Sequence, residues 1–257
     1  MAESSNAICV AESRTELSNR YRASQGFPFG TTLDWRRLTQ IQCLSLRQSV
    51  INKPTTVLRQ GQIASSFFVL VDGWGVKYKQ LGNGRRQILS FLLPGDPATL
   101  GALSQQPMAH SVQLLPDSVV DEFDPDAINR KVQDSEDLQA FISATYDNEL
   151  ARADELLTSL GRRSAKERIA HLMLEFDARL SSRGAIVDGY IVMPLRQRHL
   201  ADALGLTTIH VNRTLRALRD ENLIDVRGGV LRILHRDRLV ALANFEDSYL
   251  SVGTLPA

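Results

Sequence analysis

The stretch Leu195–Ile233 constrains the fold more than any other part of this 257-residue chain. Its first two-thirds fit two short amphipathic helices, at 196–204 and 208–221, because apolar residues recur there at helical spacing. Gly205 lies between them, where a left-handed backbone can close a tight turn. Thr207 is placed to cap the second helix. The pattern predicts two helices packed across a short turn.

Two further apolar runs, 223–226 and 230–233, flank the turn 227–229 and predict a two-stranded wing. The outer face of the second helix is polar and basic, which is typical of a helix that enters the major groove. Arg213 can donate two parallel hydrogen bonds to a guanine edge, and Thr207 with the helix N-terminus can hold a phosphate. The predicted DNA contacts are Gln197, Thr207, Thr208, His210, Asn212, Arg213 and Arg216.

The charge distribution agrees with a DNA-binding C-terminal part. The net charge of the chain is +1, but residues 161–240 hold 15 Lys and Arg against 9 Asp and Glu. The remainder holds 15 basic and 20 acidic residues. A basic module on an acidic body fits a partner rich in phosphate. The open alternative for the same segment is a protein-interaction adaptor with an incidentally basic face.

Several classes of protein are disfavoured by composition. An apolar run of the length of a membrane span is missing from the sequence, and the first thirty residues do not resemble a secretory signal. The two cysteines, Cys9 and Cys43, cannot supply the four thiolates of an ordinary iron–sulfur cluster. We expect a cytoplasmic protein with reduced thiols, no membrane partner, no metal and no cofactor.

The residue pattern of the N-terminal half is typical of a β-protein. From residue 55 to about 124, short apolar runs alternate with Gly-rich turns, which predicts a jelly roll. Asn83-Gly84 reads as a hairpin turn, since both residues accept positive φ. Before the strands we expect a helix at 34–47 with Asp34 as its N-cap, and a flexible arm at 1–30.

A long helix is predicted from Asp137 to Leu160, with a wide apolar stripe in a nearly seven-residue rhythm. Such a stripe fits either a core helix within one subunit or a helix that pairs with its twin across a dimer axis. Gly161 is the expected break. Ser164 and Glu167 then form a capping box for a second helix that runs to about residue 180, and 185–192 read as a small hairpin.

The chain resembles the superfamily of the cyclic-AMP receptor protein and the fumarate–nitrate reduction regulator (Crp/Fnr). The resemblance is carried by Leu204-Gly205-Leu206-Thr207, Val211-Asn212-Arg213-Thr214-Leu215 and Asn222-Leu223-Ile224, and by the order of roll, long helix and winged module. It implies that Arg213 contacts a base and that the long helix forms the dimer. Two positions depart from the family: Ile209 replaces a frequent glutamate, and Arg196 replaces a Thr or Ser N-cap.

Whether the roll binds an effector is left open by the sequence. Members that bind cyclic nucleotides carry a glutamate for the ribose and an arginine for the phosphate. After Pro94-Gly95-Asp96 this chain has no such glutamate, and His110-Ser111 stands where the arginine element is expected. Without the arginine the phosphate clamp is lost. A pocket for another anion at Gly101, His110 and Ser111 remains an alternative to a plain surface turn.

The resemblance implies an α+β protein: a cyclic-nucleotide-binding-like β-roll (jelly roll), a long dimerisation helix and a C-terminal winged helix-turn-helix. We expect a transcription regulator, not an enzyme, that binds double-stranded DNA as a homodimer on a pseudo-palindromic site, with RNA polymerase as a candidate partner. The alternative function is a cyclic-nucleotide-responsive protein that acts through protein contacts. The predicted boundaries are 1–30 for the arm, 31–136 for the roll, 137–161 for the dimerisation helix, 162–240 for the DNA-binding domain and 241–257 for a C-terminal helix and tail.

Overall fold

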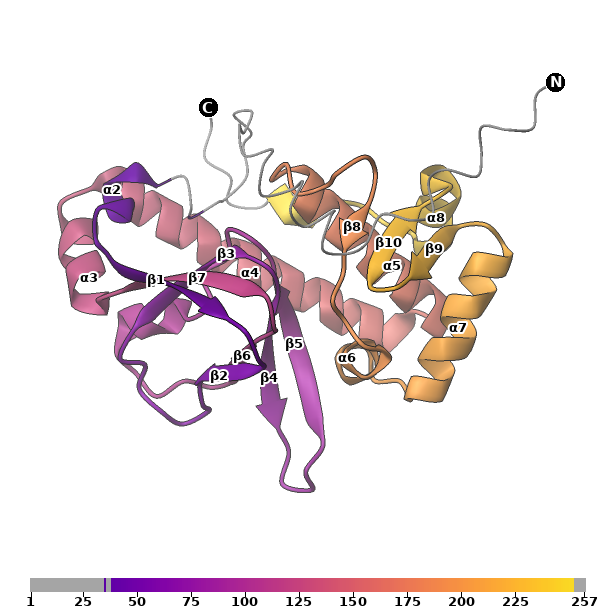
Figure 1. The fold of residues 1–257 in the computed structure, drawn as a ribbon, viewed down its shortest axis with the longest axis horizontal. Helices are drawn as coiled ribbons and strands as arrows, with labels where there is room; N and C mark the ends of the chain where they lie inside the picture. The colour runs from indigo at the N-terminus through magenta and orange to yellow at the C-terminus, as the bar shows by residue number, and fades with distance from the viewer. Residues whose placement is uncertain (1–34, 36–37, 252–257) are drawn as a thin grey trace.

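The computed structural model describes residue 35 and residues 38–251 (Figure 1). The predicted architecture is confirmed: a β-roll is followed by a long helix and then by a winged helix-turn-helix. The predicted arm at 1–30, the N-cap Asp34 and the end of the tail lie outside the described residues.

The roll consists of two antiparallel sheets that enclose an apolar core. One sheet has the order β1-β7-β3 and the other β2-β6-β4-β5. Phe67, Leu70 and Val112 lie in the core between them. The strands are β1 (Ser45–Ile51), β2 (Thr55–Leu58), β3 (Phe67–Asp72), β4 (Gly75–Gln80), β5 (Arg86–Leu92), β6 (Ser111–Leu114) and β7 (Ser118–Phe123).

Two features of the roll differ from the sequence prediction. The helix expected at 34–47 is wrong beyond residue 42: α2 spans only Thr39–Gln42, and Ser45 already begins β1. The reason is tertiary, because β1 pairs along its length with β7 and Arg47 forms an ion pair with Glu122 across that ladder. Strand β6 is absent from the sequence prediction. It begins at Ser111, the second residue of the His110-Ser111 pair at the candidate effector pocket.

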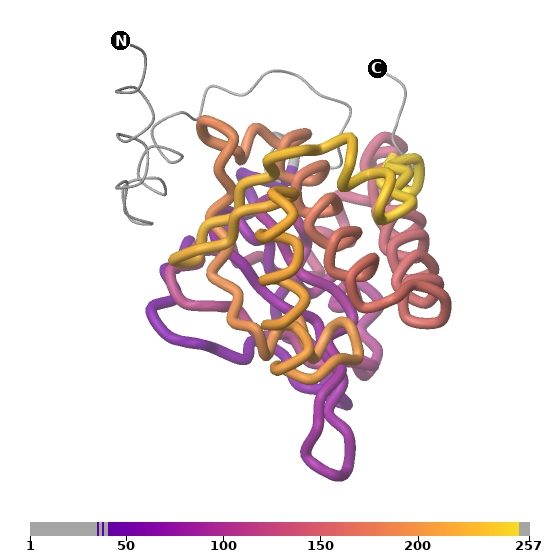
Figure 2. The backbone as a smooth tube through the Cα atoms, turned by 90° about the vertical axis from the view of Figure 1, so that its right-hand side faces the viewer, coloured from indigo at the N-terminus to yellow at the C-terminus, as the bar shows by residue number. Residues whose placement is uncertain are grey.

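The β4–β5 hairpin turns as predicted. Gly84 has φ +81° and donates its N–H to the carbonyl of Leu81 at 3.0 Å. Leu81 in turn donates its N–H to the carbonyl of Arg85 at 2.8 Å, which closes the loop. The hairpin projects beyond the rest of the roll in both views (Figures 1 and 2).

The roll leads through a short connection into two helices. A 3₁₀ turn, η2 (Leu100–Ser104), precedes β6. Helix α3 (Pro125–Gln133), which the sequence analysis did not separate, is capped by Asp124. Helix α4 (Glu136–Arg162) then runs for 27 residues along the molecule. The predicted break at Gly161 is wrong, because the helix continues through it to Arg162.

Helix α5 (Ala165–Ser181) begins with the predicted capping box, in which Ser164 and Glu167 bond each other's backbone. The expected hairpin at 185–192 is reduced to one bridge between Val187 and Tyr190. The strand that follows it, β8 (Ile191–Val192), instead pairs with the wing strand β10.

The roll and the helix-turn-helix module share one apolar core. Phe176 of α5 contacts Trp74 and Phe91 of the roll, with ring centroids 4.9 and 5.2 Å apart. Beside it the buried Asp96 accepts from Arg179 at 2.5 Å and from Arg183 at 2.7 Å. Burial alone would raise the pKa of Asp96, but the neighbouring arginine charges hold it well below its usual range. The module is therefore fixed to the roll by packing and by buried charge.

The C-terminal region returns to the long helix. Helix α8 (Arg236–Ala243) begins ahead of the predicted boundary at 241. A 3₁₀ turn, η3 (Ser248–Ser251), follows. Asn148 of α4 donates to the carbonyl of Leu250 at 2.8 Å. The end of the described chain thus packs on the helix that joins the roll and the module.

Candidate nucleic-acid interface

The two helices of the C-terminal module form the predicted helix-turn-helix. Helix α6 (Gln197–Leu204) ends at Gly205, whose φ of +64° is the left-handed conformation that favours glycine. Helix α7 (Thr208–Asp220) begins after Thr207, whose side chain accepts from the N–H of His210 at 3.2 Å. Apolar residues of both helices are buried against each other and against α5: Leu200, Ala203, Leu204, Val211, Leu215 and Leu218.

The unusual N-cap at Arg196 has a local compensation. The side chain of Arg196 makes no capping bond, but its backbone N–H donates to His199 Nδ1 at 3.0 Å. Burial and the charge of Arg86 lower the pKa of His199 to about 4. The imidazole is therefore neutral near pH 7 and keeps the lone pair that this bond requires.

The outer face of α7 is exposed, and most of the predicted contact residues lie on it. Thr208, Asn212, Arg213 and Arg216 are exposed, while His210 is half-buried. Arg213 forms no ion pair with the described residues, and Arg216 makes only a loose pair with Asp220, at 3.8 Å. The face therefore presents guanidinium groups to solvent without strong internal partners. Ile209 is 78% exposed on the same helix.

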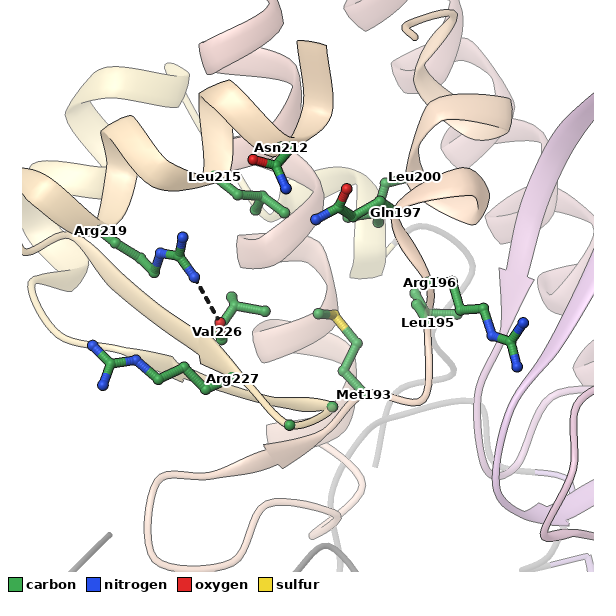
Figure 3. Close-up of a pocket in the computed structure, with 12 residues that line it drawn as sticks. Met193, Leu195, Arg196, Gln197, Leu200, Asn212, Leu215, Arg219, Val226 and Arg227 are labelled. Carbon is green, nitrogen blue, oxygen red and sulfur yellow. Dashed lines mark hydrogen bonds between the residues drawn. The ribbon is translucent and has the colours of Figure 1, made fainter. Parts of the chain in front are cut away.

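A pocket of about 270 Å³ separates α7 from the wing (Figure 3). The wing strands are β9 (Ile224–Arg227) and β10 (Val230–Ile233), as predicted. Gln197 and Asn212 face each other at one side of this pocket, and Arg227 lies at the other (Figure 3). The structure therefore brings two predicted contacts together, while Thr207 lines a different groove.

Sequence reasoning did not identify the role of Arg219. Its guanidinium donates to the carbonyl of Val226 at 3.2 Å, so it ties α7 to the wing (Figure 3). Arg227 was assigned only to the wing turn, yet it is exposed beside the pocket. The basic turn sequence Arg227-Gly228-Gly229 was the available signal for a contact from the wing.

Two basic residues at the junction of α4 and α5 are engaged within the chain. Arg163 pairs with Glu155 at 2.6 Å. Lys166 pairs with Glu221 at 2.5 Å, which joins α5 to the end of α7. The first contact stays within the end of α4, and only the second joins two different helices.

The three residues considered for an effector pocket lie in well-packed surroundings. A Cβ on Gly101 would meet only the side chain of Met108 within 4 Å. Ser111 is buried, and its hydroxyl accepts from the N–H of Gln60 at 2.9 Å. Burial and the charge of Lys77 lower the pKa of His110 to about 4, so its imidazole is neutral near pH 7.

The positive charge of Lys77, beside His110, is already neutralised by an acidic residue of the chain. The side chain of this β4 residue is buried and pairs with Glu149 of α4 at 2.5 Å. A neutral histidine beside an ion pair that is already formed offers little attraction to an anion.

Within residue 35 and residues 38–251, no helix is long and apolar enough to cross a membrane. The same residues contain no cluster of three or more histidine, cysteine or acidic side chains that could hold a metal ion.

An exposed basic helix, a short capped turn, a wing and a roll joined through a long helix define a DNA-binding transcription regulator. Comparisons with known proteins agree. Residues 167–242 match the family model for the Crp-like helix-turn-helix domain. Residues 49–135 match the model for the cyclic nucleotide-binding domain.

The nitrogen fixation regulation protein FixK of Bradyrhizobium diazoefficiens is 30% identical over 213 residues, 83% of this chain and 88% of that protein. The transcriptional activatory protein AadR of Rhodopseudomonas palustris is 30% identical, over 72% of this chain and 76% of its own length. The structure of FixK2 from Bradyrhizobium japonicum superposes with a TM-score of 0.70 at 28% identity, covering 76% of this chain and 96% of that one. The chain belongs to the Crp/Fnr family of DNA-binding transcription regulators.

Proposed function

We propose that the protein acts as a homodimer that places two copies of α7 in successive major grooves of a pseudo-palindromic site. The observation that carries this proposal is the combination of the exposed basic face of α7 with an unpartnered apolar seam on α4. Two copies of one reading helix, related by a two-fold axis, recognise two inverted half-sites about one helical turn apart.

The apolar seam on α4 supports a second copy of this chain as its partner. Tyr146, Leu150, Ala153 and Leu157 are exposed and follow the 4-3-4 spacing of a coiled coil. Leu150 is 62% and Leu157 is 68% exposed, and their alignment with Tyr146 and Ala153 makes one continuous apolar stripe, which is typical of an interaction surface. The opposite stripe, with Leu138 and Phe141, packs in the core of the roll. The wide apolar pattern thus supports both a core role and a dimer role.

The contact residues divide into two groups. Arg213 and Asn212 lie on the exposed face of α7 and supply hydrogen bonds to base edges. Thr207, Gln197 and the wing residue Arg227 line grooves beside α6 and α7, and we assign them to phosphates. Thr208, His210 and Arg216 complete the proposed interface.

The surroundings of His110 and Ser111 support DNA binding without a small-molecule effector. The hydroxyl of Ser111 is already bonded, His110 is neutral, and Lys77 is neutralised by Glu149. The module is also joined to the roll by the Asp96 cluster of buried ion pairs. We infer no catalytic role. A metal-dependent oxygenase site in such a roll needs two or three histidines, and His110 is the one histidine of the roll sequence. RNA polymerase remains the candidate partner through which bound protein would act.

The test is selection of DNA from a random library with the purified protein, without ligand, at near-physiological salt. We expect a two-fold symmetric consensus. Recovery of sites only after addition of a cyclic nucleotide would overturn effector independence. Failure to select DNA under either condition would favour a regulator that acts through protein contacts.

A further inference from the structure

The β4–β5 hairpin of the roll is attached to the helix-turn-helix. Arg86 Nε donates to Asp202 Oδ2 at 2.6 Å. Gln87 Nε2 donates to the carbonyl of Ala203 at 2.9 Å. Both partners belong to α6, the helix before the reading helix. The hairpin is therefore held in a fixed place beside the DNA-binding module.

The tip of this hairpin and the turn between α6 and α7 lie at the same edge of the molecule. Figure 1 shows the tip projecting below α6, toward the same lower edge at which α7 begins. Figure 2, viewed from the side of α7, shows the tip projecting below that helix. A groove of about 770 Å³ runs between the two elements, with Arg85 from the hairpin and Arg198 and Thr207 from the module among its lining residues.

The charges in this groove are not balanced. Arg86 is neutralised by Asp202, since the two form an ion pair. Arg85 and Arg198 are both exposed and form no ion pair with the described residues. Two guanidinium groups without an ion-pair partner among the described residues therefore lie in a groove that Thr207, the cap of the reading helix, also lines. A polyanion that already contacts α7 would be attracted along this groove.

We propose that this groove holds the phosphate backbone of the DNA that flanks the half-site, so that the roll itself contacts DNA through Arg85. Arg198 supplies the matching contact from α6. The proposal rests on the proposed function, because it extends the surface of α7. DNA fits this groove better than a separate acidic protein does, since the groove is continuous with the reading surface through Thr207.

The test compares two duplexes carrying the selected site. One has about one helical turn of flanking DNA on each side, and the other ends at the outer edges of the half-sites. Dissociation constants are measured across a salt series for the wild type, Arg85→Ala and Arg85→Lys. The matched control is Arg130→Ala on α3, which removes an exposed arginine from the end of the roll away from α6 (Figure 1).

On the long duplex, Arg85→Ala is expected to bind several-fold more weakly. The slope of log K against log salt should fall by about 2, since a dimer loses one phosphate contact in each subunit. Arg85→Lys should recover most of the loss because it keeps the charge. On the short duplex, Arg85→Ala should match the wild type, and Arg130→Ala should match it on both.

If the salt slope of binding were unchanged for Arg85→Ala on the long duplex, the groove proposal would be overturned. Selective binding of the site by the wild type would in that case still uphold the proposed function. A wild type that binds neither duplex would instead overturn the proposed function. If Arg85→Ala left DNA affinity intact but lowered transcription in a reconstituted assay, the groove would belong to a protein contact, and the DNA assignment would be wrong.

Discussion

At the scale of single residues, Arg213 has the most direct link to sequence preference. It is exposed on α7, and no described acidic group neutralises it. An arginine in this state loses little when it leaves water for a guanine edge, because the bidentate bonds replace those to solvent.

The Arg213→Ala variant should therefore lose about 1–3 kcal/mol of binding free energy on the selected site. Its affinity for random DNA should change much less, so the ratio between the two falls. Competition binding with both DNAs measures this ratio. An equal loss on both would show that Arg213 contacts phosphate.

Asp96 is the residue whose change should affect stability most. It accepts from Arg179 and Arg183 in the buried interface between the roll and α5, and Arg152 lies 4.0 Å away. The Asp96→Asn variant leaves these guanidinium groups without their carboxylate, so unfolding should become easier by about 3–5 kcal/mol. Chemical denaturation measures this difference. Asp121→Asn, at the exposed face of the β1–β7 ladder, is the control and should cost little.

At the scale of elements, local pattern predicted the helix-turn-helix well because its signals agree. Helical spacing, Gly205 and the Thr207 cap each indicate the same boundaries. The segment 45–51 shows the opposite case. Its residues carry no strong preference of their own, and the neighbouring strand β7, far along the chain, decides that it is a strand. Gly161 likewise continues α4 although it is exposed, because a single glycine costs a helix only about 1 kcal/mol.

The candidate site was predicted in part for the same reason. Residues of α7 could be assigned from one helix face, whereas the roles of Arg219, Arg198 and Arg85 depend on which other elements fold next to them. Arg219 has the same side chain as Arg213, yet the carbonyl of Val226 fixes it to the wing. Spacing along one helix carries no information about such contacts.

At this scale we predict that the apolar seam on α4 is required for the dimer. Replacing Leu150 and Leu157 together with aspartate should place charges in the dimer interface and yield monomers in sedimentation experiments. Affinity for the full site should fall by at least tenfold, because each monomer then binds one half-site alone. Leu46→Asp is the matched control: Leu46 is 65% exposed on β1, away from the seam, and its variant should stay dimeric. Dimers of the double variant would contradict the α4 interface.

At the scale of the whole molecule, the half-buried His110 and the buried His199 make stability depend on pH. Burial, with nearby positive charge, lowers the pKa values of His110 and His199 to about 4 in the folded state. The unfolded chain has pKa values near 6.5. Below about pH 6.5 the unfolded state therefore binds more protons, and folded-state stability falls until the pH approaches 4.

We expect each of these histidines to cost about 1–2 kcal/mol of stability at pH 5 relative to pH 7.5. Unfolding by denaturant at a series of pH values measures the slope. His110→Gln should reduce the slope by about half, since glutamine has no proton to gain and His199 still titrates. A slope that stays the same in this variant would mean that the imidazole of His110 does not contribute as proposed.

The central claim is that two α7 helices of one dimer read two half-sites together. The most direct measurement compares affinity for the selected site with affinity for the same site after about five base pairs, half a helical turn, are inserted at its centre. The rotated half-sites then lie on opposite faces of the duplex, so we predict a loss of affinity to nearly that of a single half-site. Equal affinity for both DNAs would contradict simultaneous reading by a rigid dimer.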